Sequence, residues 1–201
     1  MMKLFRTSYE TESDEQLMVR VAKGDQRAFG VVYDRNNAAL YRYFHRMLWK
    51  DKEKAEDFVQ DFFMKIVKSP EAFDPKRKFS TWMYSVAHNM CKNEYRRMEI
   101  RQPGDFEKAA GKAEGDHGDQ FGHRIDRKAF MKRLSGELEQ LDENHRTTFL
   151  LRYEENFSIK EISEVLNCSE GTVKSRMFYT LRRLSGKLSE FAPNESTAKR
   201  S

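Results

Sequence analysis

The stretch that decides how this chain folds is Ser158–Leu184, with the sequence SIKEISEVLNCSEGTVKSRMFYTLRRL. Ser158 and Glu161 have the spacing of a capping box, so a helix is expected to begin directly after Ser158. Ser169 can cap a second helix, because its hydroxyl can accept a hydrogen bond from an amide of the first turn. The stretch therefore predicts a short helix, a tight turn and a longer helix. This is the helix-turn-helix arrangement that places one helix in the major groove of DNA.

The second of these helices has an apolar side and a basic, aromatic side. Its apolar residues recur at helical spacing and require a core: Val173, Met177, Leu181, Leu184 and Leu188. The other side suits phosphates and base edges, and its candidate DNA-binding residues are Thr172, Lys174, Ser175, Arg176, Phe178, Tyr179, Arg182 and Arg183. A solvated amphipathic helix would carry similar charge, but the capped partner helix and the turn favour DNA binding.

Composition limits the class of protein. The chain has 201 residues, 38% hydrophobic and 34% charged, so it should form one or two small domains with modest cores. Its net charge of +5 permits nucleic-acid binding, and the basic residues gather in two separate stretches, 76–97 and 174–187. Cys91 and Cys168 lie far apart, and with His88 they supply no metal-ligand cluster. We expect a cytoplasmic protein with no cofactor, no metal and no membrane insertion, since no apolar run is long enough for a signal peptide or a membrane span.

The apolar pattern predicts an all-α chain of two small helical domains joined by a flexible linker. Helical patterning fills residues 13–98, starting at Ser13 and including helices at about 53–68 and 80–97, with a break where Pro70 and Pro75 exclude helical backbone. Residues 99–126 are rich in glycine and mildly acidic, which is typical of a flexible linker. A second domain is expected over 127–190, with tails at 1–12 and 191–201.

The expected helix at 53–68 separates into two sides. One side is a broad apolar stripe that must be buried: Ala55, Phe58, Val59, Phe62, Phe63 and Ile66. The opposite side carries Asp57, Gln60, Asp61 and Met64. Two carboxylates one turn apart could serve a divalent metal or acid–base chemistry, but the pattern supplies neither a third ligand nor a nucleophile. An acidic face for docking another protein is the more specific functional interpretation.

The loop before the helix at 80–97 combines an aromatic residue with cations. Phe73 is followed by Lys76, Arg77 and Lys78 on irregular backbone beside a basic helix. Such a combination can hold an unpaired base by stacking, which contributes about 1–3 kcal/mol per base, while the cations contact phosphates. Composition alone does not separate this interpretation from a simple basic loop.

Several motifs together resemble a known family. Glu56–Phe63 (EDFVQDFF), Phe79–Asn89 (FSTWMYSVAHN) and the pair Arg96 and Arg97 resemble region 2 of bacterial sigma-70-family sigma factors. Arg146–Tyr153 (RTTFLLRY), the pair Glu161 and Ile162, and Glu170–Arg176 (EGTVKSR) resemble region 4. The match covers about residues 13–97 and 127–188. With only regions 2 and 4 recognised, the chain resembles the small extracytoplasmic-function (ECF) subgroup of sigma factors.

The resemblance implies a non-enzymatic factor that binds core RNA polymerase, at its clamp and flap, and directs promoter-specific initiation. The first domain, a region 2 bundle, would bind the clamp through Asp57, Gln60, Asp61 and Met64. It would also contact the −10 element and aid promoter melting, with Phe73, Val86 and Asn89 shaping a pocket for a flipped base. The region 4 helix-turn-helix would read the −35 element through the residues named above. An anti-sigma factor is a further partner that the resemblance implies. The full set of −10 candidates is Phe73, Lys76, Arg77, Lys78, Val86, Asn89, Arg96 and Arg97.

The length of the linker bears on how the two domains reach DNA. Residues 101–126 as a free chain would span about 28 Å, whereas two DNA elements separated by about two helical turns lie about 70 Å apart. We expect polymerase to hold the domains apart, with the linker running through one of its channels.

The sequence leaves two other classes of function open. A polymerase-independent helix-turn-helix regulator would bind as a dimer to a palindromic site, but it leaves the acidic face of 53–68 unexplained. An enzyme acting on nucleic acid would need a metal cluster or an activated nucleophile, and the sequence presents neither pattern.

Overall fold

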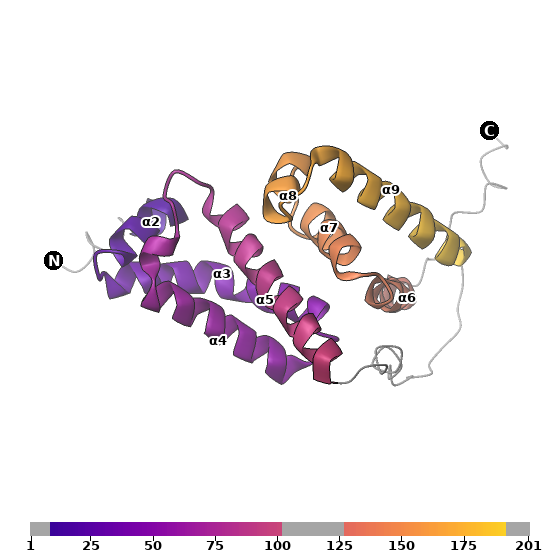
Figure 1. The fold of residues 1–201 in the computed structure, drawn as a ribbon, viewed down its shortest axis with the longest axis horizontal. Coiled ribbons are helices and arrows are strands. Elements are labelled where there is room, and N and C mark those ends of the chain that lie inside the picture. Colours follow the sequence, from indigo (N-terminus) through magenta and orange to yellow (C-terminus); the bar gives the residue numbers. More distant parts are fainter. Residues whose placement is uncertain (1–8, 102–126, 192–201) are drawn as a thin grey trace.

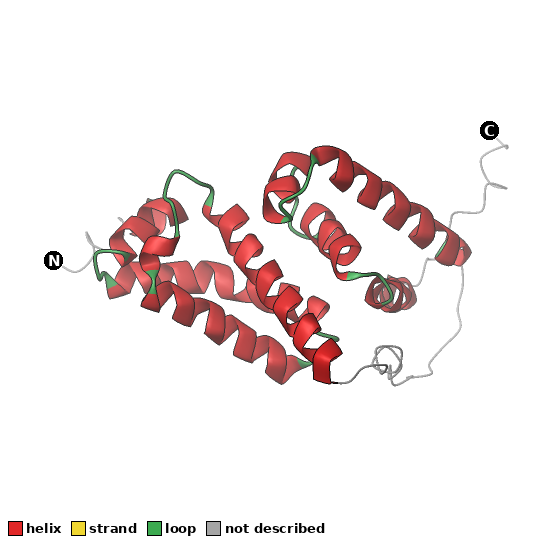
Figure 2. Cartoon of the chain, viewed as in Figure 1, coloured by secondary structure: helices red, strands yellow, loops and turns green. Residues whose placement is uncertain are grey.

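The computed structural model describes residues 9–101 and 127–191 of the chain. Within these ranges the regular structure is helical, without a strand, as expected for an all-α protein (Figure 2). The predicted linker from residue 102, the predicted N-terminal tail up to residue 8 and the predicted C-terminal tail from residue 192 lie outside the described residues. Residues 9–11 of the predicted N-terminal tail are helical rather than irregular. The helices form two groups, one from each half of the chain (Figure 1).

The first group consists of α2 (Asp14–Val21), α3 (Gln26–Met47), α4 (Lys52–Lys68), the 3-10 turn η1 (Pro70–Ala72) and α5 (Phe79–Arg101). Helices α2, α3 and α4 each begin at a capping residue, Ser13, Asp25 and Asp51 respectively. The side chain of each accepts hydrogen bonds from amides of the first turn. The break at the proline-rich segment lies where the sequence predicts it. Helix α5 runs three residues past the predicted boundary at 98, so residues 99–101 are helical rather than part of the linker.

The core of this group is built on α4. Its stripe of Ala55, Val59, Phe62, Phe63 and Ile66 is buried and Phe58 is half-buried, which confirms the predicted apolar face. The stripe meets α3 and the start of α5, with Phe62 lying 6.0 Å from the Trp82 ring. Each buried aromatic ring of this kind contributes about 1.5–3 kcal/mol by leaving water.

The second group consists of α6 (Arg127–Glu139), α7 (Glu143–Tyr153), α8 (Ile159–Val165), α9 (Glu170–Lys187) and the turn η2 (Ser189–Phe191). The capping box of Ser158 and Glu161 is formed at the start of α8, and Ser169 accepts a hydrogen bond from Thr172 N at the start of α9. Asn167 takes a positive φ of 47° in the turn between them, a conformation that Asn tolerates better than most residues. The predicted helix-turn-helix is therefore confirmed.

The apolar stripe of α9 differs from the expectation at one position. Leu181 is 42% exposed, and Thr180 is buried in its place. The reason is angular, because Val173, Met177, Thr180 and Leu184 follow the alternating four- and three-residue steps that keep a helix face aligned. Leu181 is turned about 100° away from Thr180 and so leaves the core.

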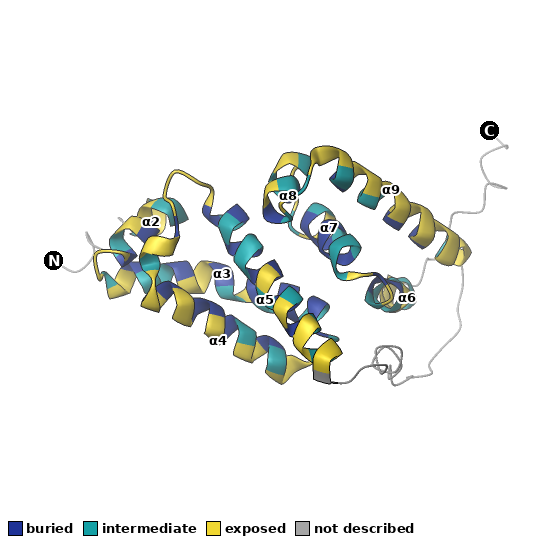
Figure 3. Ribbon diagram, viewed as in Figure 1, coloured by how far each residue is buried: buried dark blue, intermediate teal, exposed yellow. Residues whose placement is uncertain are grey.

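The two groups pack directly on each other. Helix α8 lies against α5, and α7 lies against α3 and α5 (Figure 1). One continuous set of buried side chains joins them, and Figure 3 shows buried segments on the helices of both groups at this boundary. The rings of Tyr84 and Phe157 meet edge to face at 5.3 Å, and Tyr43 Oη lies 3.2 Å from Thr147 Oγ1. We refer to residues 9–101 as the first module and residues 127–191 as the second module.

Candidate nucleic-acid interface

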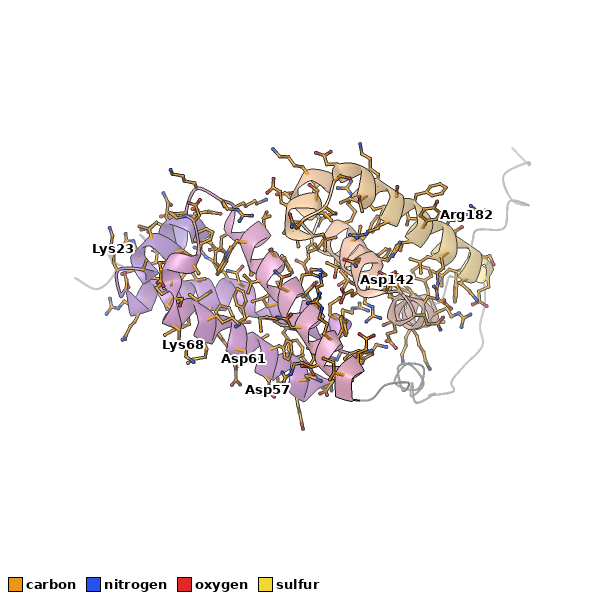
Figure 4. All side chains as sticks on the ribbon, viewed as in Figure 1. Lys23, Asp57, Asp61, Lys68, Asp142 and Arg182 are labelled. Atoms are coloured by element: carbon orange, nitrogen blue, oxygen red, sulfur yellow. The ribbon has the colours of Figure 1, made fainter. Side chains whose placement is uncertain are left out.

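Helix α9 presents an exposed surface that is both basic and aromatic. Phe178 and Tyr179 are 60% and 61% exposed, with their ring centroids 5.5 Å apart. Because burying an aromatic ring is favourable, two adjacent rings held in water make this side of α9 a candidate binding surface. Figure 4 shows Arg182 on the outer side of the same helix. The further exposed candidates on α9 are Lys174, Ser175, Arg182 and Arg183.

Two of the predicted α9 residues have partners within the helix-turn-helix. Thr172 is half-buried, and its hydroxyl lies 2.9 Å from Ser169 Oγ at the helix cap. Arg176 is half-buried, and its guanidinium donates to Cys168 Sγ at 3.7 Å. Val173 and Leu184 anchor the opposite side of the helix in the core. This anchoring holds the exposed residues in one fixed row, as recognition of a groove requires.

The predicted base-stacking residue Phe73 lies in the core of the first module. It is 4% exposed, and its ring packs against Phe79 and Trp82 at 5.4 and 5.3 Å. In this arrangement the ring cannot stack on a base, because it is buried among other aromatic side chains. Its neighbours Lys76, Arg77 and Lys78 are exposed on the following turn. In this turn the carboxylate of Asp74 accepts a hydrogen bond from Lys76 N, and the backbone carbonyl of Asp74 accepts one from Arg77 N.

Helix α5 carries the other −10 candidates along its length. Asn89 and Arg96 are exposed, and Val86 is half-buried. Arg97 is exposed and pairs with Glu94 at 3.4 Å. Glu94 in turn binds Lys54 of α4 at 2.7 Å, which fixes α5 to α4. The structure therefore brings Val86, Asn89 and Arg96 to one helix but leaves Phe73 in the core nearby.

The outward side of α4 is a separate surface. Asp57, Gln60, Asp61 and Met64 are all exposed on it, and Met64 is 49% exposed. Figure 4 shows Asp57 and Asp61 on the edge of the first module that faces away from the second. Gln60 also lines a groove of about 580 Å³ between α3 and α4, whose walls include Tyr33 and Tyr41. Among the described residues, no group of three or more His, Cys, Asp or Glu side chains could hold a metal ion.

Comparisons with known proteins identify the family of the chain. The family description Sigma-70 region 2 matches residues 32–99, and the description Sigma-70, region 4 matches residues 131–184. The chain is 32% identical to the ECF RNA polymerase sigma factor SigW of Bacillus subtilis, over 79% of this chain and 87% of that protein. The chain belongs to the sigma-70 family, in its ECF group. As a sigma factor it directs promoter-specific transcription and is not an enzyme.

Solved structures agree with the fold. The chain superimposes on the structure of CnrH in complex with the cytosolic domain of CnrY with a TM-score of 0.66 and 25% identity, covering 90% of this chain and 100% of that one. It also superimposes on the sigma factor RpoE in complex with the anti-sigma factor NepR from Bartonella quintana, with a TM-score of 0.61, 23% identity, and coverage of 78% and 94%. Among the described helices, none combines the length and the apolar character that crossing a membrane requires.

Electrostatics at the module boundary of this sigma factor depend on two titratable groups. Lys78 Nζ lies 2.5 Å from a carboxylate oxygen of Glu161, and this contact, with the hydrogen bond from Ser158 N, lowers the pKa of Glu161 to about 2. Burial, together with the nearby cations Lys92 and Arg176, lowers the pKa of His88 to about 4. His88 is therefore a neutral imidazole at pH 7, with Nδ1 at 3.2 Å from Thr147 Oγ1.

Sequence reasoning missed the residues that join the modules. Tyr43, His88 and Thr147 form a buried hydrogen-bonded chain between α3, α5 and α7. Their positions in the sequence carry no common motif, because residues more than 50 positions apart meet only in the tertiary structure. Glu161 has a local signal, the capping box, but that signal does not reveal its second partner Lys78.

Proposed function

We propose that the second module of this sigma factor reads the −35 promoter element through α9, and that the first module binds the −10 element and core RNA polymerase. The observation that carries the proposal is the exposed aromatic and basic row on α9, anchored at a capped helix-turn-helix. The row combines residues suited to base edges with others suited to phosphates. Lys174, Ser175 and Tyr179 suit base edges, and Arg182 and Arg183 suit phosphates. Each phosphate contact would make affinity fall as salt rises.

The −10 element is assigned to α5 and to the turn before it. Asn89 and Arg96 are exposed on α5, and Lys76 and Arg77 are exposed on the turn, so a strand could follow this surface. Flipping one base from the stack costs a few kcal/mol, which contacts to the extruded base must offset. Since Phe73 is buried, contact with such a base would require its ring to move out of the Phe79 and Trp82 cluster.

Polymerase docking is assigned to the outward side of α4. Its exposed acids Asp57 and Asp61 lie beside the exposed Met64, and the groove with Gln60 lies next to them. Interfaces that form between folded proteins commonly combine an apolar centre with charged groups that select the partner. This side of α4 is not covered by the second module, so polymerase can reach it in the packed arrangement of the modules.

Two further assignments belong to this proposal. An anti-sigma factor is a partner of this chain, supported by the fold shared with RpoE, whose solved structure contains an anti-sigma factor. The protein acts in the cytoplasm, where its polymerase and promoter partners would be. The alternative, a polymerase-independent regulator, is disfavoured because it gives no role to the α4 surface.

The test is run-off transcription with core polymerase, combined with separate binding assays for the two modules. Asp61→Lys should abolish capture of core polymerase while leaving binding to a −35 duplex within twofold of the parent protein. Arg182→Glu should instead abolish binding to the −35 duplex while leaving capture of core polymerase within twofold of the parent protein. Asp34→Lys is the matched control for charge, since Asp34 is exposed on α3 and does not line the groove. If the parent chain supports no transcript on any promoter, or if Asp61→Lys transcribes normally, the assignment is wrong.

A further inference from the structure

Helix α5 begins without a cap of its own. Helices α2, α3, α4, α7, α8 and α9 each start at a Ser or Asp whose side chain accepts a hydrogen bond from an amide of the first turn. At the start of α5 the corresponding residue is Lys78, whose side chain has no acceptor atom. The first turn of α5 also contains no acidic residue. The amides that open α5 therefore need an acceptor from another part of the chain.

The charges before α5 increase this need. Lys76, Arg77 and Lys78 directly precede the helix, and all three are exposed. The N-terminal end of a helix carries a partial positive charge, so cations beside it are unfavourable. A run of cations here departs from the pattern that stabilises a helix, and such departures are expected where a function requires them. The function in this case is the contact with the −10 element proposed above.

Glu15 of α2 supplies the missing acceptor. Its Oε1 accepts a hydrogen bond at 2.8 Å from Phe79 N, the first amide of α5, although the two residues are 64 positions apart. Burial disfavours the ionised form of Glu15, but the hydrogen bond from Phe79 N and the charge of Lys78 act against burial, and the pKa of Glu15 lies below its usual value. The carboxylate is therefore charged at pH 7, so it also offsets the positive end of the helix.

The packing of α2 holds this carboxylate in place. The neighbouring Asp14 binds α3 twice, through Arg35 Nη1 at 2.9 Å and through Asn36 Nδ2 at 2.9 Å. Leu17, in the first full turn of α2, is completely buried. Glu15 thus connects the start of α5 to a pair of helices that is already fixed.

The basic turn before α5 is held at both of its ends. At one end Phe73 is buried against the rings of Phe79 and Trp82. At the other end Phe79 is 1% exposed, and its amide is bound by Glu15. Residues 74–78 between these ends are exposed. The position of the three cations relative to α5 therefore depends on the contact of Glu15 with Phe79 N.

We propose that Glu15 is a positioning residue for recognition of the −10 element. It contacts no DNA itself. By capping α5, it fixes where the turn with Lys76 and Arg77 joins the helix that carries Asn89, so that these side chains meet the strand in one register. The inference rests on the proposed function for the role of the turn, whereas the cap itself does not. A cap that served stability alone would change the amount of folded protein, and this would affect every promoter equally.

Base discrimination by the full-length chain with core polymerase tests the positioning role. Run-off transcription is measured on a promoter that the parent protein uses and on copies with single substitutions in the −10 element. The ratio of the two rates does not depend on how much of the protein is folded. Glu15→Ala should reduce this ratio about fivefold to tenfold, because it removes the acceptor of an amide at a buried residue. Capture of core polymerase and binding to a −35 duplex should stay within about twofold of the parent protein.

Two matched variants and a second measurement complete the test. Glu15→Gln keeps a carbonyl oxygen that can accept from Phe79 N, so it should hold the ratio within about twofold of the parent value. Asp34→Ala removes an exposed carboxylate of α3 and is the control for loss of one charge. Hydrogen exchange of the Phe79 amide, followed by NMR in the free chain, reports on the cap without DNA. The exchange should be about tenfold faster in Glu15→Ala and nearly unchanged in Glu15→Gln.

The outcomes separate this inference from the proposed function. A parent ratio in Glu15→Ala, or equal losses in Glu15→Ala and Glu15→Gln, would overturn the positioning role. Unchanged exchange of the Phe79 amide in Glu15→Ala would overturn the cap on which that role depends, even if transcription is normal. A parent protein that discriminates no base of the −10 element would instead contradict the proposed function, while faster exchange in Glu15→Ala would leave the cap standing.

Discussion

Protonation of His88 should make the stability of this sigma factor depend on pH. The imidazole is 5% exposed, and its Nδ1 contacts Thr147 of the other module. Burial, together with Lys92 and Arg176, lowers its pKa from 6.5 to about 4. Because the pKa in the folded chain lies below that of the unfolded chain, the unfolded chain binds the proton first as the pH falls. Folding therefore loses stability between about pH 6.5 and pH 4.

The size of this effect follows from the two pKa values. At pH 5.0 a group with a pKa of 6.5 has about 30 protonated forms for each neutral one, while a group with a pKa of about 4 has about one for every ten. The unfolded state is thus favoured about 30-fold, or about 2 kcal/mol, relative to pH 7.5. Against a typical stability of about 5–15 kcal/mol, this loss is large enough to measure.

Urea denaturation followed by circular dichroism at pH 7.5 and pH 5.0 measures the loss. His88→Gln is the comparison, since its amide carbonyl can still accept from Thr147 but does not titrate. The parent protein should lose about 2 kcal/mol more than His88→Gln between the two pH values. Contributions from carboxylates such as Glu161 are common to both proteins and cancel in the difference. Equal losses in the two proteins would refute the reasoning.

Three further predictions concern Phe62, Ser169 and Arg182, each with a matched comparison variant. Phe62→Ala should lower the free energy of unfolding by about 3–5 kcal/mol because it leaves a cavity beside Trp82. In the same urea assay Met64→Ala, on the exposed side of the helix, should change it by less than about 0.5 kcal/mol; similar values for the two would contradict the assigned core. Ser169→Ala should cost about 1 kcal/mol, since it removes the cap on Thr172 N, whereas Ser169→Asn should retain most of the stability. A fully stable Ser169→Ala would mean that the cap is not formed in solution. Arg182→Ala should reduce the slope of log affinity against log salt for a −35 duplex by about 0.9. Glu164→Gln should leave the slope as it is, and an unchanged slope for Arg182→Ala would show that Arg182 contacts no phosphate.

Local sequence patterns were sufficient for most of the fold. The capping box of Ser158 and Glu161, the apolar stripe of α4 and the prolines before α5 act over a few residues, so the sequence alone predicts them. The site residues on α9 and α4 follow for the same reason, because a helix places one side of a periodic pattern in the core and leaves the other in water. Their roles toward DNA and polymerase stay predictions.

Tertiary packing decided the remaining features. Phe73 looked like an exposed aromatic because its neighbours are basic, yet the ring enters a cluster with Phe79 and Trp82 that no local pattern specifies. Thr180 rather than Leu181 is buried, because the core contacts only one side of α9. Periodicity and capping signals along the chain therefore specify two helical modules and their outward-facing surfaces. The packing of the modules on each other follows from tertiary structure alone, since the contact of Lys78 with Glu161 joins residues 83 positions apart and depends on how two completed surfaces fit.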